Sequence, residues 1–159
     1  MMGRTDPRNK VKLTPMATLG AFAILLDDDG RVLCVKQTYP PYEWTLPGGR
    51  VEPNESPLAA LHREIMEETG CRIAIERYIG TYARIDVDDL VLLFGARILE
   101  RAAWAPNHEI ADLGFFAPAA LPQPMNPRHR QRIEDAASGG PGLVRVYDAP
   151  DRLLESFLP

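Results

Sequence analysis

Residues 49–71, GRVEPNESPLAALHREIMEETGC, contain the start signal, the body and the stop signal of one helix. Ser56 followed by Pro57 is typical of a helix N-cap and first turn. Gly70 is typical of the residue just past a helix C-terminus. These signals predict a helix of about 13 residues, roughly 20 Å long. A helix fixed this closely at both ends constrains where its side chains can point.

The predicted helix has an apolar side and an acidic side. Its apolar stripe consists of Leu58, Leu61 and Ile65. At 100° per residue, Glu64, Glu67 and Glu68 project within about one third of the circumference. Carboxylates at this spacing repel one another by about 0.2–0.5 kcal/mol per pair. A solvated acidic face is the common explanation, and a cation site is the alternative, because Mg²⁺ prefers oxygen ligands and keeps positions for water and phosphate.

The residues around the helix favour the cation site. Gly48 and Gly49 precede it, and glycine lets the backbone approach a ligand closely, although an ordinary turn would also use this pair. Arg63 lies four residues before Glu67, close enough to pair with it. It could equally orient a carboxylate for metal binding, as outer residues of metal sites do.

The segment resembles the Nudix box of the Nudix hydrolases, Gly-x5-Glu-x7-Arg-Glu-U-x-Glu-Glu-x-Gly-U, in which U is usually aliphatic. The fixed positions are filled by Gly49, Glu55, Arg63, Glu64, Glu67, Glu68 and Gly70, and Ile65 fills the first U. Cys71 at the last U is the single departure, and a buried cysteine behaves as a small hydrophobe. The resemblance implies the Nudix fold, an α/β/α sandwich with a curved mixed β-sheet.

The resemblance also implies the chemistry. It implies a Mg²⁺-dependent enzyme, with Mn²⁺ as a substitute, that hydrolyses the P–O–P bond of a nucleoside diphosphate linked to another moiety. The metal ligands that it implies are Glu64, Glu67 and Glu68, supplemented by the carbonyl of Gly48 or Gly49 and supported by Glu55 and Arg63. The general base of the family is a box glutamate in some members and a loop carboxylate in others. Glu109 is the loop candidate here, with a plain surface acid as the alternative, and the neighbouring His108 fits a solvent-exposed loop.

Aromatic and arginine side chains outside the helix are the candidates for substrate contact. The candidates are Tyr42, Trp44, Arg50, Tyr82 and Arg84. Tyr39 joins the first two as an aromatic side chain that could stack on a base. Core packing competes for Trp44, and strand-face packing for Tyr82 and Arg84. A basic stretch at residues 128–132 could meet a polyphosphate, with a solvated helix face as the stronger alternative.

Substrate identity is left open among three hypotheses. The proline and tyrosine markers of ADP-ribose and dinucleoside polyphosphate hydrolases are missing after the box. The favoured substrate is a small nucleotide, such as an oxidised nucleoside triphosphate or a nucleotide sugar. The alternatives are removal of pyrophosphate from an RNA 5′ end and a non-catalytic ligand sensor. Sensors of this family usually lose box glutamates, and this chain keeps them.

The composition limits the number of domains, the partners and the cellular compartment that we expect. A chain of 159 residues, 45% of them hydrophobic, predicts a flexible segment at residues 1–12 and one domain at 13–159. A net charge of −4 argues against a general nucleic-acid surface. Two cysteines and no apolar run of membrane length predict a reduced, cytoplasmic protein without a membrane partner. Residues 153–158 could cover the core or make a dimer contact, so both monomer and homodimer stay open.

Periodicity and turn residues predict the other elements. Strands are expected at residues 16–26 and 31–37, separated by a turn that ends in Gly30, and then at 72–84, 90–100 and 113–116. Residues 39–44 are expected to form an aromatic loop, and residues 128–137 a second amphipathic helix.

Overall fold

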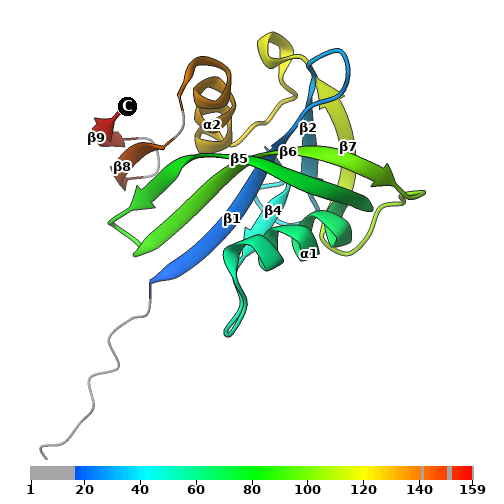
Figure 1. Ribbon diagram of the computed structural model, residues 1–159, viewed down its shortest axis with the longest axis horizontal. Coiled ribbons are helices and arrows are strands. Elements are labelled where there is room, and N and C mark those ends of the chain that lie inside the picture. Colours follow the sequence, from blue (N-terminus) through cyan, green and yellow to red (C-terminus); the bar gives the residue numbers. More distant parts are fainter. Residues whose placement is uncertain (1–16, 141, 150–151, 159) are drawn as a thin grey trace, which may run out of the picture.

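The computed structural model describes residues 17–140, 142–149 and 152–158, and shows two sheets with two longer helices (Figure 1). The larger sheet has the strand order β4-β1-β6-β5-β8-β9, and the smaller one β3-β2-β7. The strands are β1 (Thr18–Leu25), β2 (Val32–Gln37), β3 (Trp44–Thr45), β4 (Gly48–Arg50), β5 (Cys71–Arg84), β6 (Asp89–Arg101), β7 (Ile110–Phe116), β8 (Leu143–Ala149) and β9 (Arg152–Phe157). The helices are α1 (Pro57–Thr69), a short 3-10 helix η1 (Pro118–Ala120) and α2 (Pro127–Ser138).

Helices α1 and α2 cover opposite faces of the larger sheet, and alternation along β1 explains how (Figure 1). Ala21 and Ala23 share a core cluster with Ile65 of α1. Ile24 belongs to the other cluster, with Ile133 of α2. Successive side chains of a strand point to opposite faces, so one strand supplies both layers. Strand β1 is parallel to β6 and antiparallel to β4, so the sheet is mixed. The predicted α/β/α sandwich is confirmed.

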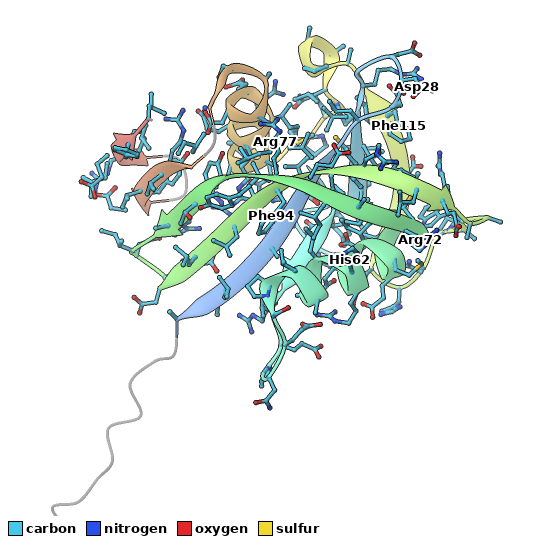
Figure 2. All side chains as sticks on the ribbon, in the orientation of Figure 1. Asp28, His62, Arg72, Arg77, Phe94 and Phe115 are labelled. Carbon is cyan, nitrogen blue, oxygen red and sulfur yellow. The ribbon has the colours of Figure 1, made fainter. Side chains whose placement is uncertain are left out.

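Side chains fill both layers, as Figure 2 shows. Arg77 of β5 lies on the α2 side, where its Nη2 donates to the carbonyl of Ala136 at 3.1 Å. Phe94 of β6 lies on the α1 side, in the cluster that contains Leu61 and Ile65. The two faces of the sheet therefore have separate cores.

Helix α1 has the predicted bounds. The Ser56 hydroxyl accepts from the amide of Ala59 at 3.1 Å, and Gly70 has φ 68° and donates to the carbonyl of Met66 at 2.9 Å. Both predicted caps are confirmed. Leu61 is fully buried, but Leu58 is 47% exposed, so its place in the apolar stripe was wrong. Leu58 lies in the first turn, and the buried residues of α1 begin at Ala60.

The strands agree with the predictions in their centres and differ at their edges. Strands β1, β2, β5 and β6 match the expected segments, apart from residue 16, which lies outside the described part of the chain. Strand β7 begins at Ile110 and not at Leu113. Strands β3, β4, β8 and β9 were not predicted. Strands β3 and β4 have only two and three residues, too few to show a period of two. Strands β8 and β9 were missed although they are at least as long as β2. Every residue of β9 is exposed, so residues 153–157 do not cover the core.

Helix α2 was expected at residues 128–137 with its basic side chains in solvent. The helix is present, but the prediction that its basic side chains are solvated was partly wrong. His129 is 6% exposed and Arg132 is 4% exposed. The Nδ1 atom of His129 accepts from the amide of Leu46 at 3.0 Å, which joins α2 to the segment before β4. Burial, together with the nearby cations Arg132 and Arg128, lowers the pKa of His129 well below its usual value. His129 is therefore neutral in the folded protein.

This buried histidine predicts a loss of stability in acid. In the unfolded chain His129 takes up a proton below about pH 6.5, whereas the folded state resists protonation to a lower pH. The free energy of unfolding should therefore fall as the pH drops below about 6.5, by up to about 1.4 kcal/mol per pH unit. Urea unfolding of His129→Asn, which keeps an acceptor for the Leu46 amide, should show a smaller loss between neutral pH and about pH 5. The variant His62→Asn, at an exposed position of α1, should keep the wild-type loss, and equal slopes in both variants would contradict this account.

Three further expectations concern the ends, the cysteines and membranes. The predicted flexible segment, residues 1–12, lies outside the described residues. Cys34 and Cys71 are both free and buried, and burial raises the pKa of Cys34 to about 12, so its thiol stays protonated. No helix in the described part of the chain has the length and apolar character needed to cross a membrane.

Candidate active site

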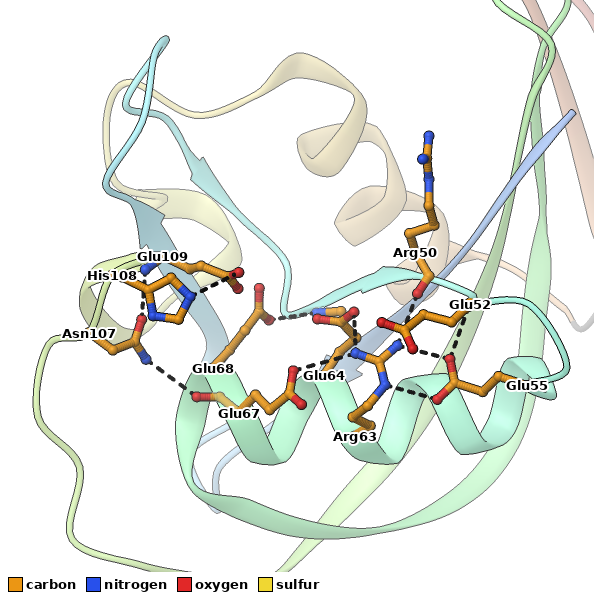
Figure 3. Close-up of polar contacts among 11 residues, drawn as sticks. Arg50, Glu52, Glu55, Arg63, Glu64, Glu67, Glu68, Asn107, His108 and Glu109 are labelled. Atoms are coloured by element: carbon orange, nitrogen blue, oxygen red, sulfur yellow. Dashed lines mark hydrogen bonds and ion pairs between the residues drawn. The ribbon is translucent and has the colours of Figure 1, made fainter. Parts of the chain in front are cut away.

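A polar hollow of about 490 Å³ lies where β4 meets the C-terminal half of α1 (Figure 3). We call it the acidic hollow. Its lining comes from β4, from α1 and from three connecting segments: Gly48, Gly49 and Arg50; Arg63, Glu64, Glu67 and Glu68; and Tyr39, Glu52 and Glu109. Four carboxylates of the predicted site, three from the helix and one from the loop, therefore lie around one space.

Two glycines make this close approach possible. Gly48 has φ +133°, and a Cβ atom there would lie 2.3 Å from the carbonyl oxygen of Ala21. A Cβ atom on Gly49 would lie 2.6 Å from the carboxyl carbon of Glu64. Real Cβ atoms essentially never come this close to another atom. At position 48 the atom in the way is backbone, so β4 can pair with β1 only because this residue is glycine, whereas at position 49 the Glu64 carboxylate would have to shift.

Arg63 connects the helix to the segments in front of it. Its Nε and Nη2 donate to Glu55 at 2.9 and 2.8 Å, and its Nη2 also donates to the carbonyl of Arg50 at 3.1 Å. Its Nη1 donates to Glu64 at 2.7 Å and reaches Glu67 at 3.4 Å. The Arg63 hydrogen bonds lower the pKa of Glu55 to about 2 and raise that of Arg63 itself. The guanidinium thus orients one carboxylate of the hollow and anchors the turn before α1.

The three helical carboxylates differ in burial. Glu68 is 9% exposed, and the amide of Gly48 donates to its Oε2 at 2.8 Å. Burial raises the pKa of Glu68 to about 8, and the neighbouring carboxylates of Glu64 and Glu109 add to this. Burial also raises the pKa of Glu64, against the lowering effect of Arg63. The Glu67 side chain is 55% exposed.

The loop before β7 brings the fourth carboxylate. Trp104 donates through Nε1 to the carbonyl of Glu68 at 2.7 Å, and Asn107 donates to the carbonyl of Glu67 at 3.3 Å. The Asn107 side chain also accepts from the amide of Glu109 at 2.9 Å. These bonds hold the loop against the end of α1, and Figure 3 shows Glu109 and Glu68 directed toward the same space. His108 lies 3.3 Å from Glu109 and is exposed, as expected.

The donor set fits a hard divalent cation. Five carboxylates line one polar hollow, and their mutual repulsion is relieved by positive charge. As arranged, no three histidine, cysteine or acidic side chains of the described residues stand ready to hold an ion. The reason is that Arg63 binds Glu64, the Gly48 amide binds Glu68, and Glu67 points partly to solvent. The long contact from Arg63 to Glu67 leaves that carboxylate free to turn inward.

Comparison with known proteins decides the family. The family model of the NUDIX domain matches residues 16–136. The chain belongs to the Nudix hydrolase family. A putative 8-oxo-dGTP diphosphatase of Bacillus subtilis (strain 168) is 41% identical over 135 residues, covering 84% of this chain and 90% of the relative. A MutT-like protein of Streptomyces ambofaciens is 26% identical and covers 84% and 86% of the two chains. The crystal structure of a MutT NUDIX hydrolase from Burkholderia pseudomallei matches with a TM-score of 0.65 at 29% identity, over 76% of this chain and 98% of that one.

Membership of a hydrolase family confirms the predicted enzyme class. It also means that the box residues on α1 belong to a family that carries out hydrolysis. The acidic hollow gathers every catalytic and metal-ligand candidate named from the sequence, together with Arg50. Their roles as ligands, base and orienting residue stay predictions. Glu52 lines the same hollow and was not predicted, since an exposed acid in a turn carries no distinguishing sequence signal.

Four of the five substrate-contact candidates lie elsewhere. Trp44 is 7% exposed and packs edge-on against Phe116 at 5.1 Å, so it belongs to the core. Tyr82 is 3% exposed, and its hydroxyl donates to Asp135. Arg84 pairs with Asp86, and Tyr42 is exposed, and neither lines the acidic hollow. Tyr39 lines it in their place, because the aromatic loop turns its first ring, and not its last, toward the glutamates.

Proposed function

We propose that this Nudix hydrolase cleaves a diphosphate bond in small nucleoside triphosphates, with Mg²⁺ as its cation. The observation that carries the proposal is the acidic hollow, which joins the complete box to a loop carboxylate in a space of about 490 Å³. Pockets of roughly 300–1,000 Å³ take ligands of nucleotide size. The Bacillus subtilis relative, which shares most of its length with this chain, is named for an oxidised guanine nucleotide, and this supports a triphosphate substrate.

Each residue of the hollow has a proposed task. Glu64, Glu67 and Glu68 hold Mg²⁺, with the carbonyl of Gly48 or Gly49 as an additional ligand. When bound, Mg²⁺ neutralises phosphate charge and makes a bound water more acidic. Arg63 keeps Glu64 in place through the bond at 2.7 Å.

The rim of the hollow has two further tasks. Arg50 lies on the rim and suits a phosphate oxygen, since guanidinium groups bind phosphate through paired donors. Glu109 accepts the proton of the attacking water, because it is a loop carboxylate directed into the same space as Glu68.

A release assay tests this proposal. Canonical and oxidised nucleoside triphosphates, nucleotide sugars, ADP-ribose and a 5′-triphosphorylated RNA oligonucleotide are each incubated with the protein, with Mg²⁺ or with EDTA, and phosphate and pyrophosphate are measured. We expect turnover of triphosphates with Mg²⁺ and its loss by at least about 100-fold with EDTA. Turnover of the RNA alone would move the assignment to RNA 5′ ends. Nucleotide binding without turnover would favour a sensor.

A further inference from the structure

A second, smaller hollow opens on the α2 side of the larger sheet, next to the acidic hollow. We call it the sheet hollow. Its volume is about 170 Å³, and its lining includes Gly20, Phe22, Gly49, Arg50, Asp89 and Val91. Gly49 and Arg50 of β4 line both hollows, so one ligand can reach from one to the other. The volume falls below the roughly 300–1,000 Å³ of pockets for whole ligands and suits a single ring system.

A buried cation lies beside this hollow without a carboxylate partner. The guanidinium of Arg132 lies 5.3 Å from the ring centroid of Phe22 and 5.1 Å from that of Tyr82. Its Nη1 meets the Nε2 of His129 at 3.3 Å, and its Nε is buried and has no hydrogen-bond partner. Arg132 forms no ion pair with an acidic side chain among the described residues, and the charge of Asp89 acts on it only from a distance.

Such an arrangement is costly for a protein that only needs to fold. A buried polar group without a partner, and a buried charge without a counter-charge, both destabilise the folded state. Arg132 nevertheless stays charged at neutral pH, since burial lowers its pKa only to about 10. The aromatic rings of Phe22 and Tyr82 offset part of this cost. A buried donor kept unpaired at such a cost is typical of a site that waits for a ligand.

The polypeptide around Arg132 holds it in place. Asp135, one turn further along α2, accepts from the Tyr82 hydroxyl at 3.0 Å and from the Nε of Arg145 at 2.7 Å. Arg145 lies on β8, so this network fixes α2 against two strands of the sheet. The Tyr82 ring therefore cannot move away from the guanidinium, and Arg132 is a rigidly placed donor.

Asp89, which lines the sheet hollow, supplies the opposite kind of group. Its Oδ1 accepts from the hydroxyl of Thr18 at 2.5 Å, and its carboxylate, like the hollow it lines, is partly open to solvent. Asp89 can only accept hydrogen bonds when ionised, and Arg132 can only donate them. A ring that carries a carbonyl oxygen next to an N–H group satisfies both.

We infer that Arg132 is a specificity-determining residue, and that its guanidinium donates a hydrogen bond to the carbonyl oxygen of a keto base, of the guanine or uracil type, lying against Phe22 in the sheet hollow. Asp89 accepts from the N–H group of the same base. The inference rests on the proposed function only in taking a nucleotide as the ligand. Adenine has no carbonyl oxygen and leaves the donor of Arg132 without this partner.

Binding measured without metal tests the inference apart from turnover. The probes are GMP, UMP and AMP, titrated by calorimetry in EDTA into the wild type, Arg132→Met and the matched control Arg130→Met from the same helix. We expect the wild type and the control to bind GMP and UMP at least about tenfold more tightly than AMP. In Arg132→Met this preference should disappear, while the melting temperature stays equal or rises because a buried charge has been removed.

Two results would overturn the inference. The first is a wild type that binds all three nucleotides equally or none of them. The second is an Arg132→Met variant that melts earlier but keeps the preference, which would make Arg132 a structural residue. The variant Asp89→Asn provides a second test, which does not depend on whether Arg132→Met folds. It should weaken GMP binding while leaving AMP binding unchanged. A wild type with the preference but without Mg²⁺-dependent turnover would refute the proposed function alone.

Discussion

Replacing Glu68 with Gln is expected to lower kcat on the best triphosphate substrate by at least about 100-fold. The variant keeps the shape of the side chain, and its amide oxygen can still accept from the Gly48 amide, as the carboxylate does at 2.8 Å. It removes the charge that the proposed cation needs. The folded state should tolerate this change, because burial already disfavours the charged form and raises the pKa of Glu68 to about 8. Steady-state kinetics and thermal unfolding, measured on the same preparation, check both halves of the expectation.

The control for this variant is Glu76→Gln. Glu76 lies on β5, pairs with Arg97 at 3.0 Å at an exposed position and does not line the acidic hollow. It should keep the wild-type kcat and melting temperature. Wild-type turnover in Glu68→Gln would remove Glu68 from the metal site, and a large fall in its melting temperature would mean that the carboxylate mainly holds β4 in place.

The second large effect is on stability. Gly48→Ala is expected to reduce the free energy of unfolding by more than about 3 kcal/mol, because it combines an unfavourable φ with a steric clash. The new Cβ atom would lie 2.3 Å from the carbonyl oxygen of Ala21 and 2.7 Å from the Cα of Phe22. Both are backbone atoms of β1, so no side-chain rotation can relieve the contact. Urea unfolding measures the loss.

Gly30→Ala separates the two causes. Gly30 also has a positive φ, +74°, but a Cβ atom there would meet nothing within 4 Å. The free energy of unfolding of Gly30→Ala should fall by about 1–2 kcal/mol, which is the cost of a left-handed backbone alone. If both variants lost the same stability, the close approach of β4 to β1 would not be the reason for the glycine at position 48.

The sequence predicts the parts of this protein that depend on local signals. The caps Ser56 and Gly70 determine the bounds of α1, and helical geometry then places Glu64, Glu67 and Glu68 on one side. An apolar run predicts β1, which is typical of a strand buried on both faces, and alternation predicts β5 and β6. The family resemblance supplied the chemistry, and the loop candidate Glu109 was found because it follows an Asn-His pair just before a strand.

The remaining parts depend on contacts between distant segments. Strand β4 can pair with β1 only because Gly48 leaves room for the carbonyl oxygen of Ala21. The burial of His129 and Arg132 follows from the packing of α2 on the sheet, where their positions in a basic stretch indicated a solvated face. Trp44 and Tyr82 were chosen for their chemistry, and tertiary packing assigned both to the core. No local pattern distinguishes a ring that stacks on a ligand from one that fills a layer.

The placement of two helices on opposite faces of one sheet has a consequence for how such an enzyme can diversify. The carboxylates of α1 and the buried cation of α2 share no side-chain contact among the described residues, and only the short strand β4 borders both hollows. Substitutions of α2 side chains that do not contact the segment before β4, as His129 does, can therefore accumulate over generations without disturbing the carboxylates of α1. New preferences can be explored on one side of the sheet while the reaction is preserved on the other.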